Sequence, residues 1–167
     1  MSDGDEQSKK FFTVETANAS LPLVRAIVQD LSSLSREVIE RRERLAHLRD
    51  GRDLDSADPY ASELVQVEED LERDSERLQE YVEELRQLGV EPKNGPEGLV
   101  DFPSLLDGRV VYLCWKLGEP EVLHWHEIDA GFRGRQSLTA DSLAGDGLMS
   151  DGLHGDSAGD DPLGSRP

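Results

Sequence analysis

Residues 98–136 read GLVDFPSLLDGRVVYLCWKLGEPEVLHWHEIDAGFRGRQ, and this stretch decides the fold of the chain. It holds both tryptophans and the only cysteine of the sequence. Two runs rich in β-branched and aromatic residues, 109–117 and 121–128, flank a Gly-Glu-Pro turn and predict a β-hairpin. Shorter strands are expected before the hairpin, at 90–93 and 99–102. The sequence therefore predicts a small antiparallel sheet.

The register of this hairpin decides which side chains share a face of the sheet. If Leu117 pairs with Val122, Trp115 faces His124 and Leu113 faces His126, with a margin of one residue. One face then carries Val111, Leu113, Trp115, His124, His126 and Ile128, and the other carries Val110, Tyr112, Cys114, Leu123 and Trp125. Both faces are too apolar for open water, because a sheet covered on one side alternates apolar with polar residues. We therefore predict a homodimer in which a second copy covers the second face.

The residues before the sheet predict a long antiparallel helical hairpin over 21–88. Apolar residues recur at three- and four-residue spacing in two segments, as in a coiled-coil seam, and Arg41 and Asp74 each interrupt one seam. Pro59 is suited to open the second helix and Gly89 to end it. The two polar interruptions are expected to set the register between the helices or to lie at a solvated edge.

A separate short helix is expected before the hairpin. Thr13 is a good N-cap residue, and this helix would run to residue 18 or 19. Pro22 would then lie in the first turn of the next helix, where its missing N–H costs nothing. Thr16 stands where a capping box has Glu or Gln, so the sequence carries only half of that signal.

These elements define an α+β fold in one domain. The domain spans 11–136, with the coiled-coil-like hairpin over 21–88 packed on the β-rich part over 89–136. Residues 1–10 are polar, and residues 137–167 are acidic and rich in Gly and Asp, with an Asp every five residues from Asp141 to Asp161. Both ends are therefore expected to be disordered.

The composition argues against several classes of function. The chain has 167 residues and a formal net charge of -18, so it repels nucleic-acid backbones and anionic membranes. No apolar run approaches the roughly 20 residues that a membrane helix needs. A single cysteine permits no disulfide within the chain, which fits a reducing compartment. We therefore expect a soluble cytoplasmic protein that binds neither nucleic acid nor membrane.

Two blocks of the sequence resemble a known family. FFTVETANASLPLVR, at 11–25, precedes the charged hairpin, and the stretch at 98–136 follows it. Together they resemble the bacterial family catalogued as domain of unknown function 2203, over residues 11 to 138. The resemblance implies no activity, because the family is defined without one.

His124 and His126 form an H-x-H pair, which is the best candidate for a metal site. Alternate residues of a strand share a face, so the two imidazoles lie about 7 Å apart and could hold zinc or another divalent metal. Asp129 is the first candidate for a carboxylate ligand, with Glu119 and Asp101 as the others. We nevertheless favour a structural role, in which one histidine packs on Trp115 and the other donates to a backbone carbonyl. We therefore expect no cofactor, with zinc or another divalent metal as the alternative.

Arg133 and Arg135 are candidates for an anion site, because the glycines beside them allow backbone N–H groups to turn inward. Trp115 and Trp125 would line such a ligand site. We favour a structural role instead, in which both arginines dock on the acidic second helix. Cys114 is expected to be a buried structural thiol, because the assumed register places it on the face away from both histidines.

The sequence contains no motif that fixes a reaction. The long charged hairpin and the absence of catalytic spacing favour a non-enzymatic, dimeric protein-interaction or scaffold module. The alternative is a small enzyme, or an anion- or metal-binding protein, that uses the histidines and arginines of 124–135.

Overall fold

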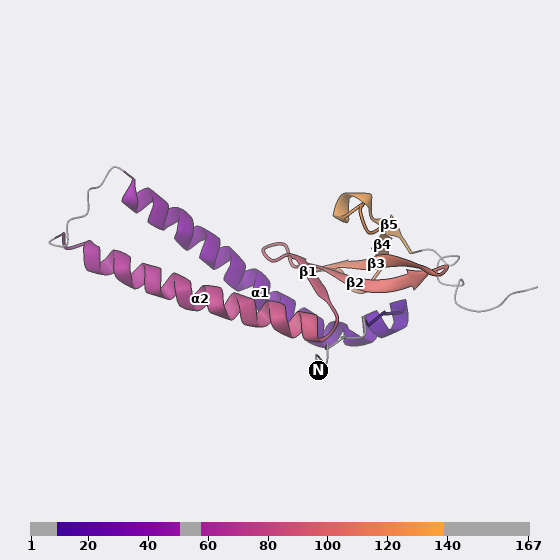
Figure 1. The fold of residues 1–167 in the computed structure, drawn as a ribbon. Helices are drawn as coiled ribbons and strands as arrows, with labels where there is room; N and C mark the ends of the chain where they lie inside the picture. Colours follow the sequence, from indigo (N-terminus) through magenta and orange to yellow (C-terminus); the bar gives the residue numbers. More distant parts are fainter. Residues whose placement is uncertain (1–9, 51–57, 139–167) are drawn as a thin grey trace, which may run out of the picture.

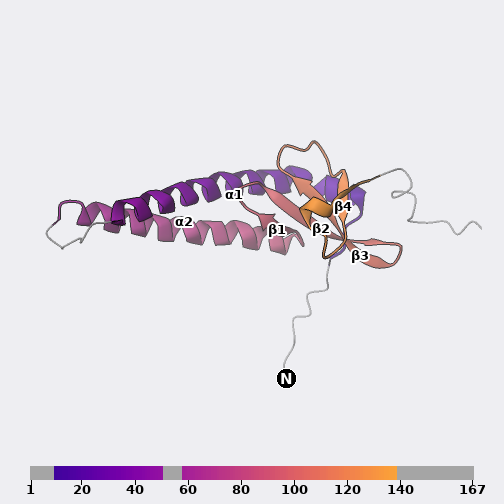
Figure 2. The same cartoon turned by 90° about the horizontal axis from the view of Figure 1, so that it is seen from above.

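The computed structural model describes residues 10–50 and 58–138. Two long helices lie side by side as an antiparallel hairpin, and its base packs on a sheet (Figures 1 and 2). The described strands form one antiparallel sheet in the order β1-β2-β3-β4-β5. The elements are α1 (Val14–Arg49), α2 (Ala61–Gln87), β1 (Glu91–Asn94), β2 (Leu99–Leu106), β3 (Arg109–Lys116), β4 (His124–His126), the 3-10 turn η1 (Phe132–Gly134) and β5 (Gln136–Ser137).

The α+β prediction is confirmed. The predicted disordered ends, 1–10 and 137–167, fall outside the described residues except for Lys10, Ser137 and Leu138. In the described part, neither helix is long and apolar enough to cross a membrane.

Helix α1 is continuous where the sequence predicted two helices, and Pro22 lies inside it. An interior proline costs about 3 kcal/mol, because it removes one backbone hydrogen bond and its ring crowds the preceding turn. The apolar side chains on both sides of it, including Leu21 and Val24, are buried in the core. Each such burial contributes about 1.5–3 kcal/mol, so packing outweighs the cost of the proline.

The first turn of α1 carries a complete capping box, which corrects the expectation of half of one. Thr16 N donates to Thr13 Oγ1 at 3.1 Å, and Thr13 N donates to Thr16 Oγ1 at 2.8 Å. A threonine hydroxyl is therefore long enough here to do what Glu or Gln usually does at this position.

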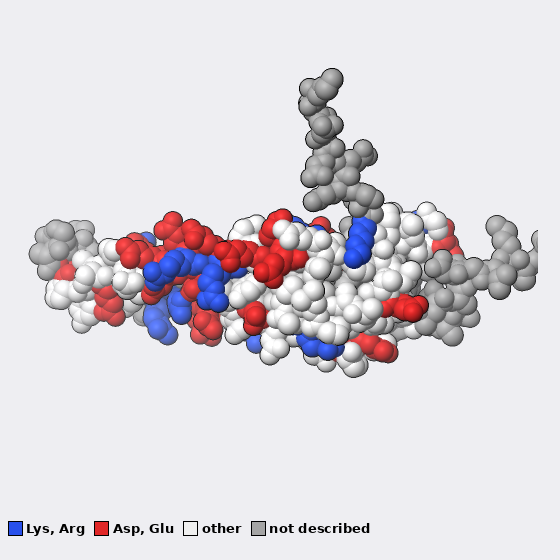
Figure 3. Space-filling view, turned by 90° about the horizontal axis from the view of Figure 1, so that it is seen from below, with Lys and Arg blue, Asp and Glu red and all other residues white. Residues whose placement is uncertain are grey.

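Ion pairs join the two helices of the hairpin. The two seam-breaking residues, Arg41 and Asp74, pair with each other, and Arg49 pairs with Glu68. Figure 3 shows acidic and basic side chains interleaved along this part of the surface. Arg41 and Asp74 therefore lie together at the partly exposed edge of the seam, where an exposed pair contributes about 0.2–1 kcal/mol. Away from the sheet the apolar seam is formed by Leu34, Val38, Leu45, Leu64 and Leu71.

The β3–β4 register differs by one residue from the predicted one. Cys114 pairs with His124 and Leu113 with Trp125, so both histidines lie on the face of Cys114. The reason is the connecting loop, which is longer than a tight turn. Val122 is buried in the helix-side core, and its backbone N–H donates to Asn18 Oδ1 of α1 at 2.7 Å. This contact with α1 draws the loop away from Leu117, and the shift moves every β4 side chain to the other face.

One face of the sheet packs on the helices and is apolar. It contributes Val100, Phe102, Val111, Leu113, Trp115 and Trp125 to the core shared with α1 and α2. The opposite face is covered by the chain itself, because the segment from β4 to β5 lies over it, in orange in Figure 1. Lys116 Nζ, from that face, lies 5.4 Å from the Phe132 ring centroid. A second copy is therefore not needed to cover this face, and the homodimer stays a prediction.

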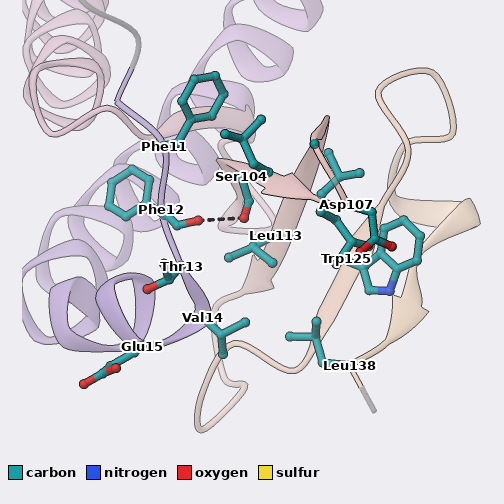
Figure 4. A pocket seen from close by; sticks show the side chains of 14 residues that line it. Phe11, Phe12, Thr13, Val14, Glu15, Ser104, Asp107, Leu113, Trp125 and Leu138 are labelled. Carbon is teal, nitrogen blue, oxygen red and sulfur yellow. Dashed lines mark hydrogen bonds between the residues drawn. The ribbon is translucent and has the colours of Figure 1, made fainter. Parts of the chain in front are cut away.

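A groove of about 600 Å³ lies where the chain enters α1, between that entry and the β2–β3 turn (Figure 4). Apolar side chains such as Val14, Leu113 and Leu138 form much of its wall. Ser104 Oγ donates to the Phe12 carbonyl at 2.6 Å, and Phe12 N donates to the Pro103 carbonyl at 2.7 Å. These bonds fix the entry segment along β2.

Candidate metal centre

Three potential metal ligands meet on the sheet face away from the helices. Asp101 of β2, Cys114 of β3 and His126 of β4 are each at most 2% exposed. One potential ligand atom from each lies within 4.8 Å of the other two. Asp101 and Cys114 are direct cross-strand partners, and His126 lies on the same face opposite Tyr112. The sheet register thus brings a carboxylate, a thiol and an imidazole together in the protein interior.

The hydrogen bonds of His126 define its tautomer. Its Nδ1 lies 2.7 Å from the Glu127 carbonyl oxygen, which can only accept, so Nδ1 carries a hydrogen and donates it. Its Nε2 lies 3.0 Å from Asp101 Oδ2. One proton must lie between Nε2 and Oδ2 when nothing else is bound, because two lone pairs would otherwise face each other. A metal cation bound between Nε2 and Oδ2 would take the place of this proton.

Asp101 carries a buried oxygen that the protein leaves unsatisfied. Among the described residues, no group donates a hydrogen bond to Oδ1. Burial raises the pKa of the Asp101 carboxyl above its ordinary value, and His126, the Lys93 charge and the Cys114 thiol oppose that rise. A buried acceptor without a donor costs about 1–3 kcal/mol. An unsatisfied buried group of this kind calls for an explanation, and a bound ion is one.

Cys114 is a protonated thiol at neutral pH when no metal is bound. Burial and the nearby Asp101 charge raise the pKa of its thiol to about 12, and the facing Arg135 guanidinium lowers it. Both nitrogens of His126 are already engaged, so this imidazole has none left to deprotonate the thiol. The arrangement does not match an activated cysteine nucleophile. The thiol nevertheless lies on the face of both histidines, which corrects the expectation that it faces away.

A second polar layer lies beside the three ligands. Arg135 Nη1 donates to Glu119 Oε1 at 2.6 Å, and His124 Nδ1 lies 3.2 Å from Glu119 Oε2. The Arg135 and Glu119 side chains are 20% and 17% exposed, so this layer reaches solvent. Arg135 therefore pairs within the β-rich part of the chain and does not dock on α2.

The other predicted site residues lie away from this cluster. Trp115 and Trp125 belong to the helix-side core, where Trp115 Nε1 donates to the Glu119 carbonyl at 3.1 Å. Asp129 and Arg133 are exposed on the covering segment. The structure thus brings His126, Arg135, His124 and Glu119 into one region, together with Asp101, and leaves Asp129, Arg133 and both tryptophans outside it.

Sequence reasoning named Asp101 only as one of three possible carboxylates and did not place Cys114 at the site. A signal for Asp101 was present, because it is the only charged residue in the apolar run LVDFP. A charged residue inside a buried strand usually has a partner or a function. For Cys114 the missing information was the register alone.

The fold and the site define an α+β protein in which a helical hairpin supports a sheet with a buried Asp-Cys-His cluster. Residues 10–138 match the family model described as "Uncharacterized conserved protein (DUF2203)", and the chain belongs to this family. The predicted resemblance is confirmed. No curated protein and no solved structure matches the chain.

Proposed function

We propose that this protein binds a divalent transition metal, with zinc as the best fit, through Asp101, Cys114 and His126. The observation that carries the proposal is the close approach of His126 Nε2 to Asp101 Oδ2, which are 3.0 Å apart in the interior beside Cys114. A metal ion in this place takes the position of the hydrogen between these two atoms and gives Asp101 Oδ1 a partner nearby.

The donor set matches zinc chemistry. Zinc binds cysteine sulfur, histidine nitrogen and carboxylate oxygen, at about 2.0–2.3 Å. Tetrahedral ligation at these lengths places donor atoms about 3.3–3.8 Å apart. The three donor atoms lie within 4.8 Å of one another, so small side-chain rotations suffice to close them around an ion.

The second contact of His126 supports ligation through Nε2. A metal-binding histidine usually donates its other ring N–H to a carboxylate or a backbone carbonyl, which fixes the ring and its tautomer. Nδ1 of His126 makes such a bond with the Glu127 carbonyl. Arg135, whose guanidinium faces the sulfur, favours the thiolate that a metal needs.

The competing explanation is that the cluster has only a structural role. In that case the hydrogen bond between Asp101 and His126 joins β2 to β4 across β3, and no ion is involved. The Cys114 thiol interacts with the same carboxyl, so a structural cluster can use all three groups, but Asp101 Oδ1 has no hydrogen-bond partner of ordinary geometry among the described residues. The metal hypothesis gives that oxygen a partner as well, and we therefore favour it.

The test is zinc binding by the full chain after removal of metals with a chelator. Native mass spectrometry gives the stoichiometry, and competition with a chromophoric chelator gives the affinity. We expect one zinc per chain, and at least about tenfold weaker binding in His126→Ala and in the nearly isosteric Asp101→Asn. His124→Ala is the matched control, because it removes a histidine two residues away that is not in the cluster. Equal zinc affinity in His126→Ala and His124→Ala would sink the proposal.

A further inference from the structure

Arg135 lies beside the buried cluster and reaches solvent, with its side chain 20% exposed, and among the described residues only one of its N–H groups has an oxygen partner. We infer that the metal takes a small oxyanion, a carboxylate or phosphate group, as an additional ligand that Arg135 holds. This inference rests on the metal site proposed above and specifies what that site binds.

Coordination number leaves room for such a ligand. Zinc in proteins is usually four-coordinate, and a site with three protein ligands keeps its fourth position for water or substrate. Among the described residues the cluster of potential ligands has three members, Asp101, Cys114 and His126. His124, the nearest further imidazole, is instead bonded to Glu119.

The charges around the cluster are balanced without a further ligand. A divalent ion is neutralised by the Asp101 carboxylate and the Cys114 thiolate. Glu119 pairs with Arg135, and Glu91, the cross-strand partner of Asp101, offsets the charge of Lys93. An additional anion would therefore be held by the metal and by the hydrogen bonds of Arg135, and not by an excess of positive charge.

The geometry of Arg135 suits this role. A guanidinium has five N–H donors in one plane and binds two oxygens of a carboxylate or phosphate side by side. Among the described residues, Glu119 is the one oxygen partner of Arg135, through Nη1 at 2.6 Å. The Phe132 ring centroid lies 4.5 Å from Arg135 Cζ, and this contact restricts the orientation of the guanidinium plane. Arg135 also lies near Cys114, because its partner Glu119 bonds His124, the cross-strand neighbour of Cys114, so an anion held by its remaining N–H groups lies near the metal.

The experiment uses the full chain loaded with cobalt(II), whose visible and thiolate charge-transfer absorption reports on its ligands. Sodium acetate and inorganic phosphate are titrated separately, at an ionic strength kept constant with sodium chloride. We expect a saturable spectral change, and the anion that binds more tightly identifies the oxyanion class. The apparent affinity should fall at least about tenfold in Arg135→Gln, because a charge-assisted hydrogen-bond pair is lost. The matched control, Arg133→Gln, removes an exposed arginine of the same segment and should behave as wild type.

The outcomes separate the two proposals. A cobalt spectrum without thiolate absorption contradicts the metal site, and the anion inference fails with it. A normal cobalt spectrum that neither anion changes contradicts the anion inference alone. So does an anion response that is equal in Arg135→Gln and wild type, since Arg135 would then only support the thiolate.

Discussion

The two faces of the sheet are both buried, but different parts of the chain bury them and with different chemistry. The face toward the helices carries Phe102, Trp115 and Trp125, and it shares one apolar core with α1 and α2. The opposite face carries Asp101, Cys114 and His126 and is covered by the segment between β4 and β5. Apolar burial stabilises a fold without requiring a specific geometry between the groups. Buried polar groups, in contrast, need hydrogen-bond or charge partners in a defined geometry. The helix-side face therefore has the composition of a stabilising core, and the other face holds the cluster that we propose as a metal site.

Removing Trp115 should have the largest effect on stability. Its side chain is fully buried in the helix-side core, and Trp→Ala substitutions in such positions cost about 3–5 kcal/mol. The free energy of unfolding is measured by denaturant titration with helical circular dichroism, because tryptophan fluorescence changes with the substitution. Leu105→Ala, an exposed residue of β2, is the control and should stay within about 0.5 kcal/mol of wild type. If Trp115→Ala lowers the free energy of unfolding by less than about 1 kcal/mol, the helix-side face is not the main source of stability.

Zinc binding at the polar face should give the second-largest change in the free energy of unfolding. A ligand that binds only the folded state adds about 2.7 kcal/mol at a free concentration one hundred times its dissociation constant. The measurement is the free energy of unfolding of metal-free protein with and without zinc. Asp101→Asn should gain much less than wild type at the same zinc concentration, because it lacks the ligating carboxylate. An equal gain in both proteins would show that zinc acts elsewhere.

Without metal, His126→Ala should cost about 1–3 kcal/mol, less than Trp115→Ala. The substitution leaves Asp101 and the Glu127 carbonyl without their partner on the buried face, and unmade bonds there carry the full desolvation cost. The raised pKa of Asp101 limits the loss, because the carboxyl can take up a proton when its partner is absent. Chelator-treated proteins are compared by thermal unfolding, with His124→Ala as the less buried reference. A loss larger than that of Trp115→Ala would reverse the comparison between the faces.

The helical hairpin could be predicted from sequence, because apolar spacing in α1 and α2 depends only on neighbours along the chain. The polar cluster could not, because its assembly depends on the β3–β4 register. The loop that precedes β4 is tied to α1 by a bond between Val122 and Asn18, which are 104 positions apart, so the register depends on contacts that local sequence does not show. A shift of one residue moved Cys114 to the face of His126, and the alternation of a strand looks the same in either register. The continuity of α1 through Pro22 was missed for a similar reason, since burial against distant residues outweighs a local preference.

The smallest expected effect comes from the polar group buried on the apolar side. Ser104 lies next to the helix-side core and donates to the Phe12 carbonyl at 2.6 Å (Figure 4). Ser104→Ala removes that donor but leaves the Phe12 N–H bond to Pro103 in place. We therefore expect a loss of about 0.5–1.5 kcal/mol, the usual net value of one such hydrogen bond. Ser33→Ala, at an exposed position of α1, is the matched control for denaturant titration.

Zinc affinity should be unchanged in Ser104→Ala, because the bond lies on the other side of the sheet from the metal ligands. A change in zinc affinity would show that the two faces are coupled, and the division between a stabilising face and a binding face would then be too sharp.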